Sequence, residues 1–233
     1  MARQYGKDYI YLVWKEPMSR RQYTIAKLSK NGKYEFKYDF DIKEAMDKGF
    51  ELLVAFNDID KTYESDRLFA SFSSRIPDRR RKDIDKILNK YKLSEYNEYE
   101  LLKKSGGKLP IDNLEFIDPI INNGENPIKR SFYIAGTRHY LGCKGNECVK
   151  SLDVNLNERL YLNPNTNNKY DKYAIEILNE GKKLIGYIPR YYSEELSKLL
   201  ENGANYSINI CEINKEANCN ECLKVNLDVH LNY

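Results

Sequence analysis

The sequence predicts a mixed α+β protein, in which a small N-terminal α+β subdomain precedes a mostly antiparallel β-barrel with one short helix. Helical and strand patterns alternate before residue 118, whereas short strand patterns with a single helix follow residue 130. The stretch between them, DPIINNGENPIKR, holds two prolines, one glycine and three asparagines, which is typical of a linker. We therefore expect domains at 1–118 and 131–233, joined by a linker at 119–130.

The strands of the first domain are marked by turn residues and by apolar runs. Segments 10–17 and 23–38 are strand-like, and Asn31-Gly32 favours a tight turn within the second of them. The apolar run at 50–56, FELLVAF, predicts a further strand.

Three helices are predicted in the first domain, at 41–50, 79–93 and 99–107. The middle one has the clearest pattern, because its apolar residues recur at helical spacing, with Asp78 as a suitable N-cap. Glycines end the other two. The apolar stripe consists of Ile84, Ile87, Leu88 and Tyr91.

The second domain consists of short strand patterns and one helix. The predicted helix, SEELSKLLENG at 193–203, places three leucines inward and ends at Gly203. The predicted strands are 131–136, 158–162, 173–178, 184–189, 206–213 and 223–231.

Charge gives little indication of a partner. Residues 1–130 contain 26 Lys and Arg against 22 Asp and Glu, and residues 131–233 contain 12 against 13. Neither half has the strong positive field that dominates non-specific DNA binding, so a nucleic-acid contact would need a local pocket. The sequence has no apolar run near the roughly 20 residues of a membrane span and no signal-peptide pattern, so we expect a cytoplasmic protein without a membrane partner.

No catalytic signature is found. The sequence lacks the phosphate-loop, dinucleotide, zinc-protease and nucleophile-elbow motifs, and its only histidines are His139 and His230. No pair of carboxylates has the spacing and apolar setting of a general acid and base. We expect a protein that is not an enzyme and has no cofactor.

Four cysteines leave one alternative open. Cys143 and Cys148 form a CxxxxC pair, and Cys219 and Cys222 form a CxxC pair. Four thiolates on two turns can close a structural zinc site, although the first spacer is longer than usual. Alternatively, Cys148 is a small apolar residue in a turn.

The basic run DRRRK at 78–82 has two interpretations. Cations at a helix start oppose the helix dipole, which points to an anionic partner such as a phosphate or an acidic protein surface. The alternative is an ordinary solvated first turn.

Three motifs in the second half resemble the HIRAN domain: FYIAGTRHY at 132–140, LYLNPNTNNKYDKYAIEIL at 160–178 and KLIGYIPRYYSEELSKLL at 183–200. The resemblance spans residues 131 to about 231. It implies a modified OB-like barrel and, as in fork-remodelling helicases, capture of the 3′ end of single-stranded DNA.

The resemblance also implies roles for residues at matching positions. Tyr170 would stack on the terminal base, Asp171 would accept a hydrogen bond from the 3′-hydroxyl, and Arg138 would hold a phosphate. His139 occupies a position that is aromatic in the helicases. The rest of the rim consists of Tyr140, Tyr187 and Arg190.

This sequence departs from the family at the loop before Asp171. The family's Asn-Pro-Tyr-Asp is NKYD here, and the run from Leu160 to Asp171 is about two residues longer than the family pattern. The alternative reading is that Tyr170 and Asp171 only form the turn, with Asp171 capping backbone amides.

The first half resembles the N-terminal subdomain of HipA-type serine/threonine kinases. The matching stretches lie at 11–38, 49–58, 65–91 and 99–117, but no kinase catalytic body follows. The resemblance implies an antitoxin-like regulatory subunit that docks on a separate HipA-type kinase. This hypothesis is compatible with the DNA-end hypothesis. A third hypothesis is that the protein is an enzyme in its own right.

Overall fold

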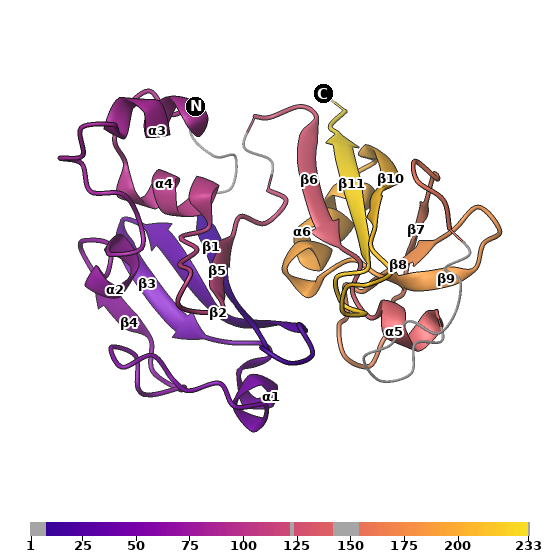
Figure 1. The fold of residues 1–233 in the computed structure, drawn as a ribbon, viewed down its shortest axis with the longest axis horizontal. Coiled ribbons are helices and arrows are strands. Elements are labelled where there is room, and N and C mark those ends of the chain that lie inside the picture. The colour runs from indigo at the N-terminus through magenta and orange to yellow at the C-terminus, as the bar shows by residue number, and fades with distance from the viewer. Residues whose placement is uncertain (1–7, 122–123, 142–153, 233) are drawn as a thin grey trace. The chain divides into compact units, whose positions relative to one another are not determined.

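The computed structural model describes residues 8–121, 124–141 and 154–232. The chain divides into two compact units (Figure 1). One comprises the chain up to Pro119 without residues 18–20, and the other comprises residues 18–20 together with the chain from Ile120 onward. No helix within the described ranges has the length and apolar character needed to cross a membrane.

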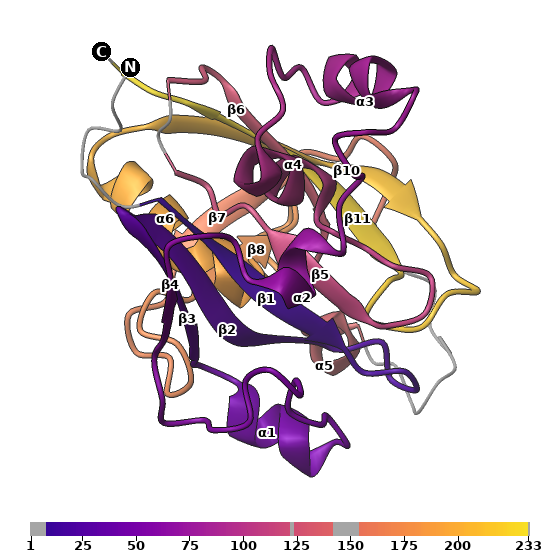
Figure 2. The same cartoon turned by 90° about the vertical axis from the view of Figure 1, so that its left-hand side faces the viewer.

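The N-terminal unit is built on one antiparallel sheet with the strand order β4-β3-β2-β1-β5 (Figure 2). The predicted turn is confirmed, because Gly32 lies between the paired residues Asn31 and Lys33 with a φ of 85°, which suits glycine. The strands are β1 Tyr9–Lys15, β2 Gln22–Asn31, β3 Lys33–Tyr38, β4 Tyr63–Ser65 and β5 Leu114–Ile117.

Short helices accompany this sheet. The side chain of Asn97 accepts hydrogen bonds from the amides of Tyr99 and Glu100 at the start of α4, and Gly106 ends the helix with a φ of 73°. The predicted helix at 99–107 is therefore confirmed, with its end at Gly106. The helices are α1 Ile42–Asp47, α2 Ala70–Ser73, α3 Ile84–Lys90 and α4 Glu98–Ser105.

The predicted strand at 50–56 is wrong. Phe50 and Phe56 are buried at its two ends, but Val54 between them is 97% exposed. The amide of Leu53 donates to the hydroxyl of Tyr38, at 2.9 Å, and not to a neighbouring strand. The segment is irregular because only part of its apolar run is buried in the core.

The predicted start of the helix at 79–93 is also wrong. The helix begins at Ile84 with Asp83 at the N-cap, although the stripe that contains Leu88 is confirmed on its inner side. Asp78 instead accepts the amide of Arg80 at 2.7 Å and pairs with its guanidinium. A basic first turn opposes the helix dipole, so this stretch forms a turn before the helix.

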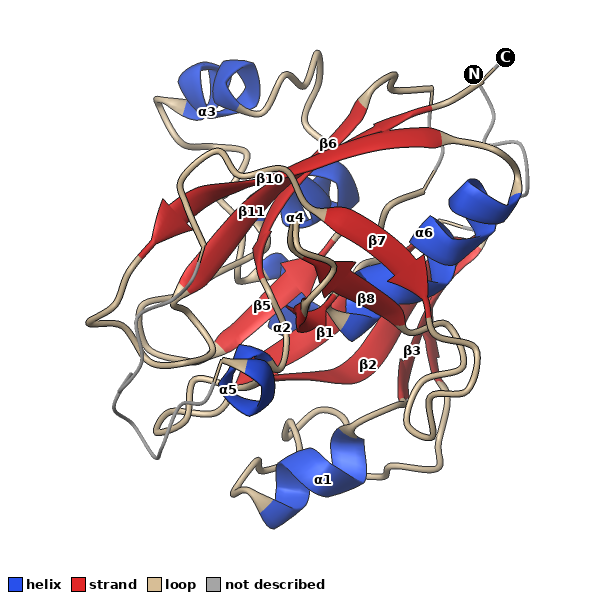
Figure 3. Ribbon diagram, turned by 90° about the vertical axis from the view of Figure 1, so that its right-hand side faces the viewer, coloured by secondary structure: helices blue, strands red, loops and turns tan. Residues whose placement is uncertain are grey.

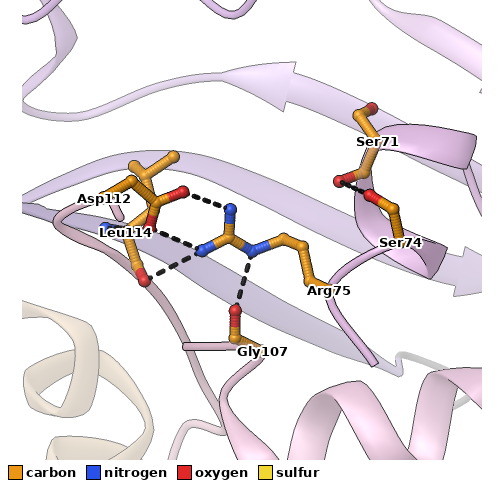
Figure 4. A network of polar contacts seen from close by, with 6 residues as sticks. All are labelled: Ser71, Ser74, Arg75, Gly107, Asp112 and Leu114. Carbon is orange, nitrogen blue, oxygen red and sulfur yellow. Dashed lines mark hydrogen bonds and ion pairs between the residues drawn. The ribbon is translucent and has the colours of Figure 1, made fainter. Parts of the chain in front are cut away.

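Arg75 joins two distant segments of the N-terminal unit (Figure 4). Its side chain is 8% exposed and forms a two-point contact with Asp112, at 2.6 and 2.9 Å. Its Nε also donates to the carbonyl of Gly107, at 2.8 Å. Burial alone would raise the pKa of Asp112, but the hydrogen bonds from Arg75 and from the Leu114 amide hold that pKa below its ordinary value.

Where the structure describes it, the C-terminal unit has two three-stranded antiparallel sheets, β10-β11-β6 and β7-β8-β9 (Figures 1 and 3). They meet at two isolated bridges, Ala135 with Tyr187 and Arg159 with Asn209. The strands are β6 Ile128–Tyr133, β7 Tyr161–Pro164, β8 Ile175–Leu178, β9 Leu184–Tyr187, β10 Asn205–Ile213 and β11 Leu223–His230. The predicted mixed α+β class with antiparallel sheets is confirmed, whereas closure into an OB-like barrel stays a prediction.

The described residues of this unit form two helices, α5 Thr137–Tyr140 and α6 Arg190–Glu201. The second packs on the β10-β11-β6 sheet through Tyr192, whose ring centroid lies 5.4 Å from that of Phe132. It begins three residues before the predicted start, and Gly203 follows its end with a φ of 83°. The first was not predicted, because a four-residue helix leaves no periodic pattern.

Gly186 allows the two sheets to approach each other. A Cβ at this position would lie 2.5 Å from Cγ2 of Ile134 and 2.6 Å from the carbonyl oxygen of Ala135. With glycine, the backbones of Ala135 and Tyr187 exchange two hydrogen bonds of 2.9 Å. The Gly-Tyr pair of the motif therefore places Tyr187 beside α5.

Candidate nucleic-acid interface

The loop between β7 and β8 holds the ring of Tyr170 in solvent. Oδ1 of Asn168 accepts the amides of Tyr170 and Asp171, at 2.9 and 3.1 Å, which fixes the backbone of the turn. The amide of Asn165 bonds the carbonyl of Ala174 at 2.8 Å and closes the base of the loop. The ring of Tyr170 is nevertheless 87% exposed, so an aromatic surface stands on a fixed backbone.

The Asp171 carboxylate binds both its own turn and the helix beside it. Oδ1 accepts the amide of Tyr173 at 2.9 Å, and Oδ2 accepts the hydroxyl of Ser193 on α6 at 2.6 Å. Oδ1 therefore caps a backbone amide of the turn, as the turn interpretation expects, whereas Oδ2 contacts α6. Since each carboxylate oxygen has two lone pairs, both can accept one further hydrogen bond.

Arg190 lies next to this pair. It is the first residue of α6 and donates to the carbonyl of Tyr170 at 3.1 Å. The loop and the helix start thus bring together Tyr170, Asp171 and Arg190, three of the predicted site residues.

A second group forms around α5, which places the exposed side chains of Arg138 and His139 on the surface. The ring of Tyr140 lies 6.5 Å from His139 and 5.8 Å from Tyr187, centroid to centroid. Burial raises the pKa of Tyr140 to about 12, supported by its hydrogen bond with Tyr187 and the nearby Glu176 carboxylate. Tyr140 therefore remains a neutral hydroxyl at physiological pH.

Tyr187 connects the two groups. Its hydroxyl lies 3.3 Å from Nδ2 of Asn165, at the base of the Tyr170 loop, and 3.4 Å from Oε1 of Glu176. Asn163 and Asn165 also donate to the Glu176 carboxylate, at 2.7 and 2.9 Å. The predicted residues thus line one polar and aromatic rim that runs from α5 to the start of α6.

The loop that contains Cys219 and Cys222 contacts the start of α5. The buried hydroxyl of Thr137 donates to the Cys219 carbonyl at 2.5 Å, and Sγ of Cys222 lies 3.2 Å from the same oxygen. Cys143 and Cys148 lie outside the described residues, so the zinc site stays a prediction. Within 8–121, 124–141 and 154–232, no three side chains of the metal-binding types form a cluster.

Two hollows among the described residues lie apart from this rim. One of about 420 Å³ opens between the turns at 155–158 and 179–181, and one of about 290 Å³ lies beside β4 in the N-terminal unit. Neither is lined by a predicted site residue. A nucleic acid on the rim would therefore bind a surface of rings and polar groups, as single-stranded DNA commonly does.

The basic run at 78–82 is partly neutralised. Arg80 pairs with Asp78 at 2.9 Å and Arg81 with Asp83 at 2.8 Å, all on the surface. Hydrogen bonds from Arg80 lower the pKa of Asp78 to about 2. The local ion pairs favour the solvated interpretation of this run.

Sequence reasoning missed three residues that shape the rim: Ser193, Asn165 and Glu176. Their roles arise from contacts across 22 and 11 positions of the chain, and no local spacing indicates them. The one available signal was the strand pattern of YAIEIL, which places Glu176 on the outer side of β8, because its neighbours Ile175 and Ile177 are buried.

Comparisons with known proteins agree with both resemblances. Residues 130–233 match the HIRAN domain, and residues 18–110 match the HipA N-terminal domain. The predicted arrangement, a HIRAN domain after a HipA N-terminal domain, is confirmed. HIRAN is a binding domain, and the match to it supports DNA binding by the second half of the chain. The HipA N-terminal domain is not itself catalytic.

Two solved structures are similar to parts of the chain. The HIRAN domain of human HLTF is 21% identical, covering 46% of this chain and 78% of its own, with a TM-score of 0.33. A protein from Lactobacillus plantarum is 16% identical, covering 43% of this chain and 91% of its own, also with a TM-score of 0.33. The comparison with curated proteins found no match.

Proposed function

We propose that the C-terminal unit binds the 3′ end of single-stranded DNA along the rim from α5 to the start of α6. The observation that carries this proposal is the ring of Tyr170, which is 87% exposed on a loop whose backbone is fixed. An exposed tyrosine on a fixed backbone is a preorganised stacking surface, because little conformational freedom is lost on binding.

Stacking supplies the affinity that charge does not. A base stacked on an aromatic ring contributes about 1–3 kcal/mol, and this interaction needs no strongly basic surface. The second half of the chain has 12 Lys and Arg against 13 Asp and Glu, so a contact based on rings suits its composition. Arg138 and Arg190 then provide local positive charge for the adjacent phosphates.

Asp171 makes the site prefer DNA that ends in a free 3′-hydroxyl. Its carboxylate can accept one further hydrogen bond on each oxygen, and a terminal 3′-hydroxyl is a donor. A 3′-phosphate in the same place would bring two negative charges together. The hydroxyl of Ser193 holds the carboxylate in place for this contact, at 2.6 Å.

Fluorescence anisotropy with short labelled oligonucleotides tests this proposal. We expect an oligonucleotide with a free 3′-hydroxyl to bind more tightly than the same oligonucleotide with a 3′-phosphate, by about tenfold, the effect of about 1.4 kcal/mol. An oligonucleotide with a 5′-phosphate serves as the control, because it carries the same added charge at the other end. Equal affinities for the two 3′ ends would exclude end recognition.

A second function concerns the N-terminal unit. We propose that residues 18–110, which match the HipA N-terminal domain, bind a separate HipA-type kinase and regulate it as an antitoxin does. Co-purification of the full chain with a HipA-type kinase from the same genome tests this. Recovery of a stoichiometric complex is the expected result, whereas separate elution of both proteins at micromolar concentration would contradict it.

A further inference from the structure

Two cations lie over one ring at the far end of the β7-β8-β9 sheet from the Tyr170 loop. Nζ of Lys182 is 3.8 Å from the ring centroid of Tyr161, and Cζ of Arg159 is 5.6 Å from it. Tyr161 begins β7, and Lys182 lies in the turn between β8 and β9. We call Arg159 and Lys182 the cation pair.

The ring holds the cation pair in place, because the negative face of an aromatic ring attracts cations. Both side chains are exposed, and among the described residues neither forms an ion pair with a carboxylate. Two exposed cations near one ring, without carboxylate partners, attract an anion. Their chemistry therefore suits a phosphate group.

The cation pair and the DNA-end rim belong to the same face of the sheet. Tyr161 and Asn163 are two positions apart on β7, so their side chains share a face. Asn163 pairs with Glu176, and Glu176 pairs with Tyr187, which continues this face across to β9. The opposite face of β8 is buried in the core through Ile175 and Ile177.

The distance between Tyr187 and Tyr161 matches the length of a short single strand of DNA. From Tyr187 to Tyr161 the path crosses two strand spacings and moves two residues along a strand, which together span about 12 Å. At the spacing of about 3.4 Å per nucleotide in a stacked strand, this is the length of three to four nucleotides.

We propose that the cation pair binds a backbone phosphate of single-stranded DNA whose 3′ end is held at Tyr170, three to four nucleotides further along the strand than the nucleotide at Tyr187. This inference rests on the proposed function and adds the direction in which the bound strand leaves the rim. The strand would cross the outer face of β9 and β8 towards β7.

Nearby carboxylates do not prevent a DNA strand from following this path. Asn163, Asn165 and Tyr187 donate hydrogen bonds to Glu176, so donors already surround its charge. The carboxylate of Glu158 accepts the amide of Asn155 at 2.8 Å, within its own turn. Glu180 is exposed in the turn that carries Lys182, and it is the acidic side chain that the phosphate would have to avoid.

The experiment compares a trinucleotide with an octanucleotide, both with a free 3′-hydroxyl, on the full chain. The native chain should bind the octanucleotide about tenfold more tightly. In a variant with Arg159→Gln and Lys182→Gln, most of this gain should disappear while trinucleotide affinity and the 3′-hydroxyl preference remain. The slope of log affinity against log salt for the octanucleotide should fall by about 0.7, the contribution of one phosphate contact on a single strand.

Two control variants separate binding from general charge and packing. Lys215→Gln removes another exposed cation, from the turn after β10, and should leave both affinities unchanged. Tyr161→Leu should reduce the octanucleotide gain, because the cations lose the ring that orders them, whereas Tyr161→Phe should preserve it.

The outcomes distinguish this inference from the proposed function. If the native chain discriminates between 3′ ends but binds both lengths equally, the inference is wrong and the proposed function stands. If the double variant keeps the full length gain, the phosphate lies elsewhere and the inference is also wrong. If the native chain binds neither oligonucleotide, both fail.

Discussion

The carboxylate of Asp171 and the hydroxyl of Ser193 lie 2.6 Å apart, and this contact ties the Tyr170 loop to α6. Asp171 precedes β8, whereas Ser193 lies one turn into the helix. The same loop is tied to the helix start by the bond from Arg190 to the Tyr170 carbonyl. The exposed ring therefore stands on a loop held from two sides, which distinguishes it from an ordinary surface tyrosine.

The first prediction concerns the coupling between these two residues. In a double-mutant cycle with Asp171→Ala and Ser193→Ala, we expect a coupling energy of about 1.5–3 kcal/mol in unfolding of the C-terminal unit, as for a hydrogen bond to a charged group. Urea denaturation of the four proteins measures it. A coupling near zero would show that solvent satisfies the carboxylate and that the loop is held by its own turn alone.

The second prediction concerns the support of α5. Thr137→Val removes a buried hydroxyl and leaves the Cys219 carbonyl without that donor, so the C-terminal unit should lose about 1–3 kcal/mol of stability. Because α5 carries Arg138, His139 and Tyr140, oligonucleotide affinity should also fall. Thr137→Ser keeps the hydroxyl and should retain both properties, and a Thr137→Val protein as stable as the native one would contradict this role.

The third prediction concerns Gly186. A Cβ there would lie 2.5 Å from Ile134 and 2.6 Å from the Ala135 carbonyl, so Gly186→Ala should cost about 1–3 kcal/mol through overpacking. Gly181→Ala is the matched control in the same unit, because its Cβ would meet only the Asn179 side chain at 3.4 Å. Thermal unfolding of the two variants should separate them, and equal melting temperatures would show that the sheets part without cost.

The fourth prediction is a pH dependence of the N-terminal unit. The folded pKa of Asp112 lies below its ordinary value because Arg75 donates to it, so this contribution to stability is complete above the unfolded pKa of about 3.9. It is lost as the pH falls through the lower folded value. Asp112→Asn should lower stability at pH 7 by about 3 kcal/mol and flatten the acid slope.

Urea denaturation at several pH values between 2 and 7 measures this effect. Arg75→Lys is the informative companion, because lysine keeps the charge but cannot make the two-point contact at 2.6 and 2.9 Å. An Asp112→Asn variant with the native acid slope would mean that other carboxylates account for it.

Local chemistry explains which parts of the fold could be predicted. The Asn31-Gly32 turn and the α4 stop at Gly106 follow from backbone conformations that glycine adopts readily, with φ values of 85° and 73° for the two glycines. The strand at 50–56 could not be excluded, because its apolar content fits a strand and only tertiary contacts show that Val54 faces solvent. Asp78 is a good N-cap by type, but the arginines after it favour a turn with local ion pairs.

The candidate site likewise has residues that the sequence predicted and contacts that only the structure shows. Tyr170, Asp171 and Arg190 were identified from motif positions, and the structure brings them together. The contact from Ser193 depends on how α6 packs beside the loop, which no sequence spacing reveals. The cation pair is likewise separated by 23 positions along the chain and becomes visible only through the ring of Tyr161.

The most direct test of the stacking surface is the affinity of Tyr170→Ala for a short oligonucleotide with a free 3′-hydroxyl, measured by anisotropy beside Tyr170→Phe and the native chain. The loss of one stacking contact, worth about 1–3 kcal/mol, predicts that the affinity of the alanine variant falls by about 5-fold to 150-fold. Phenylalanine keeps the ring and should bind like the native chain. If Tyr170→Ala binds as tightly as the native protein, the exposed ring is not the platform and the proposed DNA-end site is wrong.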